Sequence, residues 1–189
     1  MNSTIALILL ALVVLTGCAR ALGRAETSLY AGRYDEAAAR FQEVLAAQPD
    51  NADALVGLGI AKYRLGTLDE AERAFAEAGR RAPERPVPQL YLGLIALLRG
   101  QDAAGGESLR RYAAAGAPRV ALDIERALRA LGSGPATEEM RRYVASSIED
   151  QAAWAGELLA TQQALAGSDQ RRITEDRTLL LLPHACRCR

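Results

Sequence analysis

Evenly spaced glycines constrain the fold of this chain more than any other sequence feature. Gly32, Gly66 and Gly100 follow one another at intervals of 34 residues. Self-similarity at a fixed period of this length indicates a stack of short units, each of which buries its apolar face against its neighbours. Further positions repeat with the same step and keep their residue type, namely small Ala37, Ala71 and Gly105, large apolar Phe41, Phe75 and Leu109, the pairs Leu58-Gly59 and Leu92-Gly93, and Pro49 and Pro83.

Each unit has the features of two helices joined by a short turn. Small Gly59, in the first helix of the middle unit, allows a neighbouring helix to approach closely. The glycine of the turn, Gly66, can adopt the left-handed conformation that ends a helix. Thr67 and Glu70 have the spacing of a capping box, in which Thr67 caps the first amides of the second helix and Glu70 reaches back. The pattern therefore predicts helix, turn and helix in every unit.

The composition agrees with a helical fold. Half of the residues are apolar and only 5% are aromatic, while alanine, leucine, arginine and glutamate are abundant. These four residues lose little side-chain freedom in a helix, whereas β-sandwiches and barrels need β-branched and aromatic runs. The formal net charge is zero, which argues against a protein that binds nucleic acid by its phosphates.

The pattern resembles the tetratricopeptide-repeat family from about Ala21 to Pro118. The unit from Ala52 to about Arg85 carries the best match, and the next unit, from Pro86 to about Arg119, is also good. The first unit is partial, with its first helix expected at Ala21 to Tyr30 and its second at Tyr34 to Gln48. The resemblance implies an all-α, right-handed helical solenoid of about three helix pairs, whose first helices line a concave surface.

Two more helices are expected after Pro118, where the period ends. Val120 to Leu131 is amphipathic and is followed by glycine and proline residues. Thr137 has the position of an N-cap for a long helix that extends to about Ala166. Because a solenoid needs a terminal cap with a polar outer face, we expect this helix to be the cap. Its apolar stripe consists of Met140, Tyr143, Val144, Ile148, Ala152, Ala155, Leu158, Leu159 and Leu165.

The N-terminal residues resemble a bacterial lipoprotein signal. Ile5 to Leu15 form an apolar run that is too short to span a bilayer, and Leu15-Thr16-Gly17-Cys18 resembles a lipobox. The resemblance implies that Cys18 becomes the mature N-terminus and carries the fatty-acyl groups, such as palmitate, that anchor a lipoprotein facing the periplasm. Ala19, in place of Asp, favours the outer membrane. Because Met1 to Thr4 contains no basic side chain, an uncleaved anchor or an ordinary signal peptide is the alternative.

The concave surface is the feature most relevant to function. An apolar surface of this size indicates a protein partner, either an amphipathic helix or an extended apolar segment. The alternative is that the chain's own helix from Thr137 lies on this surface and completes the core. The ligand-facing positions of the family, transferred residue by residue, are Val56, Ile60 and Tyr63 on the second unit, Leu90, Leu94 and Leu97 on the third, and Glu26 and Leu29 on the first.

Catalytic motifs are absent from the sequence. His184 is the only histidine, so no Ser-His-Asp or Cys-His pair can be built on the repeats, and there is no glycine-rich phosphate loop. No cofactor, bound metal or small-molecule substrate is expected. His184, Cys186 and Cys188 form an H-x-C-x-C cluster, but this spacing is not one of the common closed zinc patterns. An enzyme or metal-handling protein that uses these residues is the alternative to a scaffold.

The sequence predicts four segments and one role. The segments are a signal peptide at 1–17, the repeat array at 18–118, the capping helices at 119–167 and a disordered tail at 168–189. The expected role is that of a lipid-anchored scaffold or adaptor of the bacterial cell envelope. It binds other envelope proteins through the concave surface and is not an enzyme.

Overall fold

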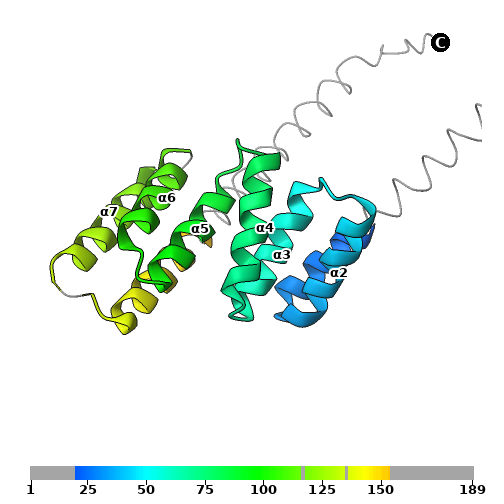
Figure 1. The fold of residues 1–189 in the computed structure, drawn as a ribbon, viewed down its shortest axis with the longest axis horizontal. Helices are drawn as coiled ribbons and strands as arrows, with labels where there is room; N and C mark the ends of the chain where they lie inside the picture. Colours follow the sequence, from blue (N-terminus) through cyan, green and yellow to red (C-terminus); the bar gives the residue numbers. More distant parts are fainter. Residues whose placement is uncertain (1–19, 116–117, 135, 154–189) are drawn as a thin grey trace, which may run out of the picture.

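The protein is a row of stacked helices (Figure 1). The structure is a computed structural model that describes residues 20–115, 118–134 and 136–153, and every regular element in these ranges is a helix. The all-α prediction is thereby confirmed for this part of the chain. The elements are the N-terminal helix (20–30), α2 (Tyr34–Ala47), α3 (Ala52–Arg64), α4 (Leu68–Arg81), α5 (Val87–Leu98), α6 (Asp102–Ala114), α7 (Pro118–Gly132) and the C-terminal helix (138–153).

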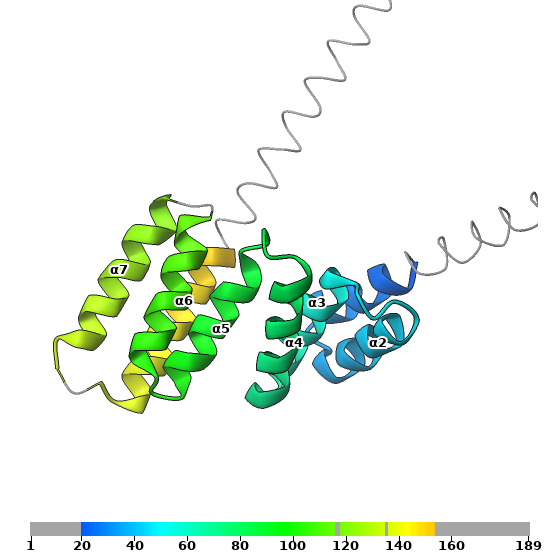
Figure 2. The same cartoon turned by 45° about the horizontal axis from the view of Figure 1, so that its top comes forward.

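The helices pair in chain order into repeated units. Unit 1 is the N-terminal helix with α2, unit 2 is α3 with α4, and unit 3 is α5 with α6. The first helices of units 2 and 3 each pack between two second helices, since α3 contacts both α2 and α4 and α5 contacts both α4 and α6. Helix α7 then packs on α6. Figures 1 and 2 show the N-terminal helix behind α2 and the C-terminal helix, in yellow to orange, behind α5 and α6.

The turn inside each unit is built in the same way three times. Gly32, Gly66 and Gly100 have φ of 71°, 77° and 75°, the left-handed conformation that the sequence predicted. In the middle unit the N–H of Gly66 donates to the carbonyl of Tyr63, and the N–H of the next residue donates to the carbonyl of Lys62. The other two turns have the same pair of bonds. This is a Schellman-type cap, which closes the last turn of the first helix.

The capping box predicted for α4 is wrong. The side chain of Thr67 makes no bond to the first amides of α4; instead its hydroxyl donates to the carbonyl of Lys62, 3.0 Å away. The carboxylate of Glu70 forms an ion pair with the ammonium of Lys62, at 2.7 Å. The left-handed turn at Gly66 places both side chains beside the last turn of α3, so they complete that helix rather than start the next one.

Small residues of the first helices make room for large ones from the second helices. A Cβ added to Gly59 would lie 2.7 Å from Cε1 of Phe75, and one added to Gly93 would lie 2.7 Å from Cγ of Leu109. Phe75 and Leu109 are fully buried. Phe75 also stacks on Tyr91 of unit 3, with ring centroids 4.8 Å apart. The close approach predicted at the repeated glycines is therefore confirmed, and the same large side chain joins successive units.

Buried apolar side chains form two clusters along the row. The smaller one lies in unit 1 and at its border with α3, and the larger one extends from α4 to the C-terminal helix. Helix α7 contributes its inner face to the larger cluster, while Leu122 on its outer face is exposed. The predicted helix from Val120 to Leu131 is thus confirmed as a packed element. The smaller cluster consists of Ala25, Ala37, Ala38, Phe41, Val44, Ala54 and Ala61.

We predict that Gly59→Ala destabilises the protein. Because Phe75 is buried and held against Tyr91, it cannot move away from the added methyl group. Overpacking of this kind costs about 1–3 kcal/mol, which exceeds the roughly 1 kcal/mol gained when alanine replaces a glycine in a helix. Urea unfolding followed by circular dichroism measures the difference.

Gly79→Ala is the matched control for this substitution. A Cβ at Gly79 would lie 3.7 Å from Cβ of Pro88, an ordinary contact, so this variant should be as stable as the unmodified protein or more stable. Equal unfolding midpoints for Gly59→Ala and Gly79→Ala would contradict the packing argument.

Candidate functional site

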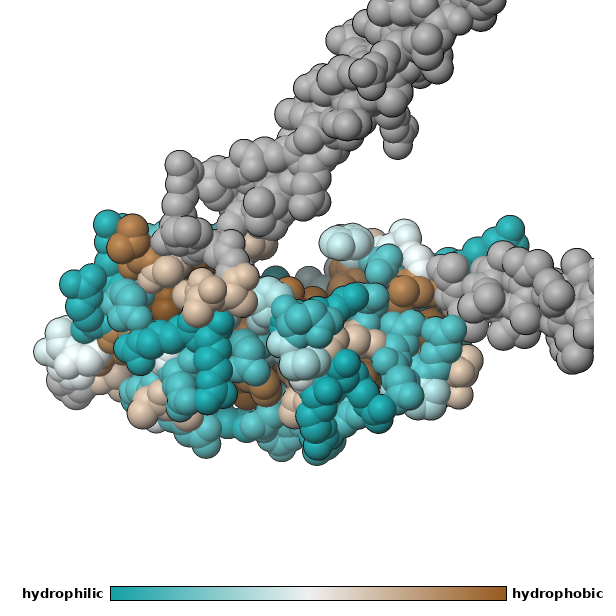
Figure 3. Space-filling model, turned by 90° about the horizontal axis from the view of Figure 1, so that it is seen from above, coloured by the Kyte–Doolittle hydropathy of each residue, from teal (hydrophilic) through white to brown (hydrophobic). Residues whose placement is uncertain are grey.

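The first helices of the units share one side of the row, which we call the concave surface. The N-terminal helix, α3 and α5 contribute to it at positions related by the 34-residue step, such as Glu26, Ile60 and Leu94. Apolar side chains reach the surface on this side between the two ends of the row (Figure 3). The surface has two parts with different surroundings, one over unit 3 and one over units 1 and 2.

The part over unit 3 is covered by the chain itself. Leu90, Leu94 and Leu97 are only 4%, 0% and 0% exposed. They belong to one buried cluster with four residues of the C-terminal helix, which are Val144, Ala145, Ile148 and Ala152. Of the two alternatives left by the sequence, self-capping is therefore what the structure shows over α5. These three leucines serve the core in this conformation.

A buried carboxylate fixes the C-terminal helix on this surface. Glu149 is 6% exposed; it accepts a hydrogen bond of 3.0 Å from the hydroxyl of Tyr91 and forms an ion pair of 2.9 Å with Arg64 of α3. The ring of Tyr63 meets Tyr91 edge to face, with centroids 5.2 Å apart. Burial, followed by the charge of Glu149, raises the pKa of Tyr63 to about 12 and raises the pKa of Tyr91 as well. The upward shifts mean that burial beside Glu149 disfavours the charged form of both phenols.

A second ion pair holds the start of the C-terminal helix. The guanidinium of Arg141 donates to both carboxylate oxygens of Asp102, at 2.8 and 2.9 Å. The hydrogen bond from Arg141 keeps the pKa of Asp102 below its usual value. The N–H of Met140 donates to the hydroxyl of Thr137 at 3.2 Å, so the predicted N-cap at Thr137 is confirmed. The helix is thus attached to α6 at its start and to α3 and α5 near Glu149.

The buried face of the C-terminal helix differs from the predicted stripe. Met140 and Tyr143 are 42% and 74% exposed, although the sequence placed them on the apolar side. The buried face also includes Ala145 and Glu149. At about 100° per residue, these two residues move the centre of the face away from Val144, so Tyr143 lies on roughly the opposite side. The hydrogen bond and ion pair of Glu149 hold this charged residue on the buried side. The predicted stripe contained only apolar residues and therefore had a different centre.

The part of the concave surface over units 1 and 2 is not covered by any helix in the described ranges. We call it the open groove. Its apolar side chains, Leu22, Leu29, Val56 and Ile60, are half-buried, Glu26 is exposed and Tyr30 is 88% exposed. Arg64 lies at its border with the C-terminal helix. Tyr63, the third predicted position of unit 2, is half-buried beside Tyr91.

Comparison with known proteins agrees with the repeated geometry. Residues 28–98 match a family model described as tetratricopeptide repeat. These residues form a tetratricopeptide array. The fold also resembles that of the Yersinia enterocolitica type III secretion translocator chaperone SycD, with a TM-score of 0.50 and 17% identity over 69% of this chain and 80% of that chain. At this identity the likeness concerns the fold alone, and no curated protein sequence matches the chain.

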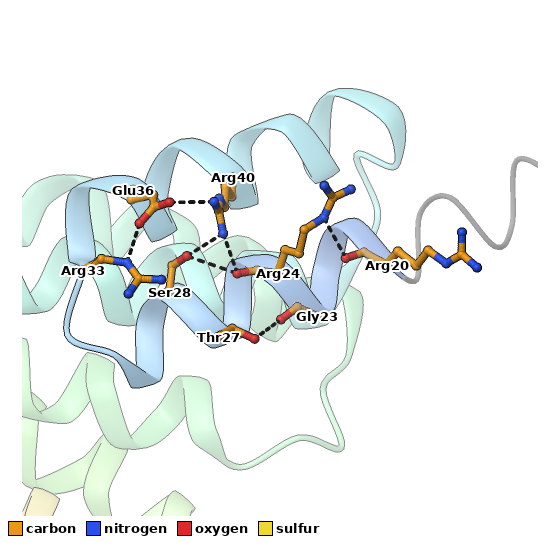
Figure 4. A network of polar contacts seen from close by, with 8 residues as sticks. All are labelled: Arg20, Gly23, Arg24, Thr27, Ser28, Arg33, Glu36 and Arg40. Atoms are coloured by element: carbon orange, nitrogen blue, oxygen red, sulfur yellow. Dashed lines mark hydrogen bonds and ion pairs between the residues drawn. The ribbon is translucent and has the colours of Figure 1, made fainter.

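A polar network attaches the N-terminal helix to its partner α2 (Figure 4). The guanidinium of Arg40 donates to the hydroxyl of buried Ser28 at 2.8 Å and to the carbonyl of Arg24 at 3.1 Å. It also forms an ion pair with Glu36 at 2.6 Å. The sequence did not single out Arg40, because Ser28 and the carbonyl of Arg24 lie on another helix. The network positions the N-terminal helix, which forms one wall of the open groove.

Several sequence predictions concern residues outside the described ranges. These are the signal peptide and Cys18, the tail with its His184, Cys186 and Cys188 cluster, and the helix beyond residue 153. Among the residues that the structure does describe, no helix is both long and apolar enough to cross a membrane. The same residues contain no group of three or more His, Cys, Asp or Glu side chains arranged to hold a metal.

We predict that Glu149→Ala loosens the C-terminal helix from the tetratricopeptide array. The substitution leaves the buried hydroxyl of Tyr91 without its acceptor and Arg64 without its ion pair. Loss of hydrogen bonds to a charged group costs about 1.5–3 kcal/mol, which urea unfolding should detect. Asp150→Ala is the control, since Asp150 is exposed on the same helix and surface substitutions stay within about 0.5 kcal/mol. A Glu149→Ala variant as stable as the control would show that the contacts of Glu149 with Tyr91 and Arg64 do not fix the C-terminal helix.

Proposed function

We propose that the protein is a lipid-anchored scaffold of the bacterial cell envelope, which binds other envelope proteins through the open groove. The open groove carries this proposal. Val56 and Ile60 pack against the larger cluster but stay partly exposed, whereas the equivalent Leu90 and Leu94 are buried. Apolar surface of this kind on a folded protein usually marks an interaction site. It suits an amphipathic helix or an extended apolar segment of the partner.

The fold supports a protein as the ligand. Tetratricopeptide arrays are scaffolds for protein–protein interaction, and the similar Yersinia enterocolitica protein is described as a chaperone of type III secretion translocators. The groove helices offer few charged side chains toward a ligand, since Arg64 is engaged by Glu149 and Asp53 by Arg85. Shape and apolar contact would therefore dominate recognition.

The position of Cys18 relative to the array supports membrane anchoring as part of the function. Arg20 already belongs to the N-terminal helix, and in the sequence it comes two positions after the predicted lipidated cysteine. A lipid group at Cys18 would hold unit 1, and with it the open groove, next to the bilayer. Several acyl chains give stable anchoring, because each buried methylene contributes about 0.8 kcal/mol. A partner at the inner face of the outer membrane would meet the groove there.

Partner binding is tested with Val56→Asp and Ile60→Asp combined in one chain. A photoreactive residue at exposed Glu26 is crosslinked in cells, and the attached proteins are identified by mass spectrometry. We expect the double variant to lose at least about 90% of the crosslinked partner, since a charge must be desolvated on binding. Leu94 is unsuitable for this test because it lies in the core.

The control for this test changes the charge on the opposite side of the row. Ala39→Asp and Ala76→Asp alter exposed positions of α2 and α4 and should leave the crosslinks unchanged. Circular dichroism must show equal helix content in both double variants. Crosslinks that survive Val56→Asp and Ile60→Asp in a folded protein would exclude the open groove as the binding site.

Anchoring is tested separately with Cys18→Ser. Because the thiol accepts the lipid, this variant should incorporate no labelled palmitate and should leave the washed membrane fraction. Cys186→Ser is the control and should behave as the unmodified protein. Palmitate incorporation by the Cys18→Ser variant would rule out the predicted lipobox.

A further inference from the structure

One helix is already seated on the concave surface, and its contacts show how this surface holds a helix. The C-terminal helix (138–153) lies over unit 3, where Leu90 and Leu94 of α5 are buried in one cluster with it (Figures 1 and 2). Glu149, on the buried face of this helix, forms its ion pair with Arg64 of unit 2. The apolar contacts thus come from the unit beneath the helix, and the ion pair comes from the unit before it.

The 34-residue repeat relates these contacts to positions of the open groove. Leu94 corresponds to Ile60, and Arg64 corresponds to Tyr30. A helix placed over unit 2, as the C-terminal helix is placed over unit 3, would therefore rest on Ile60 and Val56, both of which are partly exposed. The residue of that helix equivalent to Glu149 would lie beside Tyr30.

The charge at this position is reversed between unit 2 and unit 1. Where unit 2 presents a guanidinium to the neighbouring helix, unit 1 presents the 88% exposed ring of Tyr30. Glu26, also exposed, lies one helical turn before Tyr30 on the same face. The basic residues of the N-terminal helix, Arg20 and Arg24, are at least about 120° around the helix from Glu26. The side of unit 1 that borders the groove therefore presents a carboxylate.

A carboxylate and an aromatic ring one turn apart suit a guanidinium group. The carboxylate can accept two parallel hydrogen bonds from an arginine, while the planar guanidinium stacks on the ring. A glutamate at the same place would be repelled by Glu26, because like charges brought together at an interface are unfavourable. The groove thus favours a ligand whose central charge is opposite to that of the C-terminal helix.

We propose that the open groove binds a partner helix that places an arginine against Glu26 and Tyr30 while its apolar residues lie on Val56 and Ile60. Charge then directs each helix to its own unit. The chain's own helix, with Glu149, is matched to Arg64, and the partner's helix is matched to Glu26. The inference rests on the proposed function, since it specifies the chemistry of the partner that the groove would bind.

The proposal is tested with two fluorescent peptides and the full chain. Both peptides have the sequence of residues 137–153, and one of them carries Glu149→Arg, so they share the apolar residues and differ in one charge. Fluorescence anisotropy should show that the arginine peptide binds at least about fivefold more tightly, as expected for one ion pair and one cation–π contact at a partly exposed site. Equal affinities, or no measurable binding of the arginine peptide, would overturn the proposal.

Glu26→Lys in the full chain is the deciding variant. It should reverse the preference, so that the peptide with the natural glutamate binds more tightly. Glu43→Lys, at an exposed position of α2, is the matched control and should keep the preference for arginine. Val56→Asp combined with Ile60→Asp should abolish binding of the arginine peptide. A preference for arginine that survives Glu26→Lys, in a chain with unchanged helix content, would exclude Glu26 as the recognition residue.

The result is separable from the crosslinking test of the proposed function. In that test the photoreactive residue replaces Glu26, so crosslinks report a partner in the groove whatever its charge. Crosslinks that depend on Val56 and Ile60 can therefore support the proposed function while equal peptide affinities overturn the arginine contact. Conversely, the peptide preference can be observed even if no envelope protein is crosslinked.

Discussion

The fold depends on the contact between a glycine in the first helix of units 2 and 3 and a large apolar side chain from the second helix of the same unit. Gly59 lies against Phe75 and Gly93 against Leu109, with no room for a methyl group. This contact sets the distance between the two helices of a unit. The same Phe75 then stacks on Tyr91 of the next unit, so one side chain fixes both the pair and the stack. The contact occurs at positions 34 residues apart, so successive units stack in the same way. This regular stacking places the first helices on one side of the row.

Structural features that repeat along the chain could be predicted from the sequence, whereas features that occur once could not. The left-handed glycines, the buried Phe41 and Phe75 and the Thr137 cap were all predictable, because each depends on residues close in the chain or one period apart. The cluster of Arg64, Tyr91 and Glu149 was not, because its members lie on three helices and outside the period. The failed capping box at Thr67 has a similar origin. Thr67 and Glu70 fit a local motif, but the preceding turn places both side chains beside α3. Thr67 therefore bonds to the carbonyl of Lys62, and Glu70 pairs with the ammonium of Lys62.

The candidate site could be predicted only in part, because only some of its features depend on residues related by the repeat. The family resemblance placed Val56, Ile60 and Leu90 on one surface, and in the structure these residues lie on the first helices α3 and α5. Periodicity could not show that a helix some 50 residues later in the chain packs over unit 3. The buried face of that helix includes the charged residue Glu149, which an apolar pattern does not predict. The surface that we propose as the partner site in unit 2 therefore serves the core in unit 3, with similar residues in both.

The cluster of small side chains in unit 1 has a mechanical consequence. Five of its seven fully buried members are alanines, and an alanine buries far less apolar area than the leucines and isoleucines of unit 3. In a linear array each unit depends on its own contacts and those of its neighbours, so unit 1 opens at a lower free energy than the rest. We therefore expect the end of the row nearest to Cys18 to be its most deformable part, so that units 2 and 3 could tilt relative to the proposed lipid anchor.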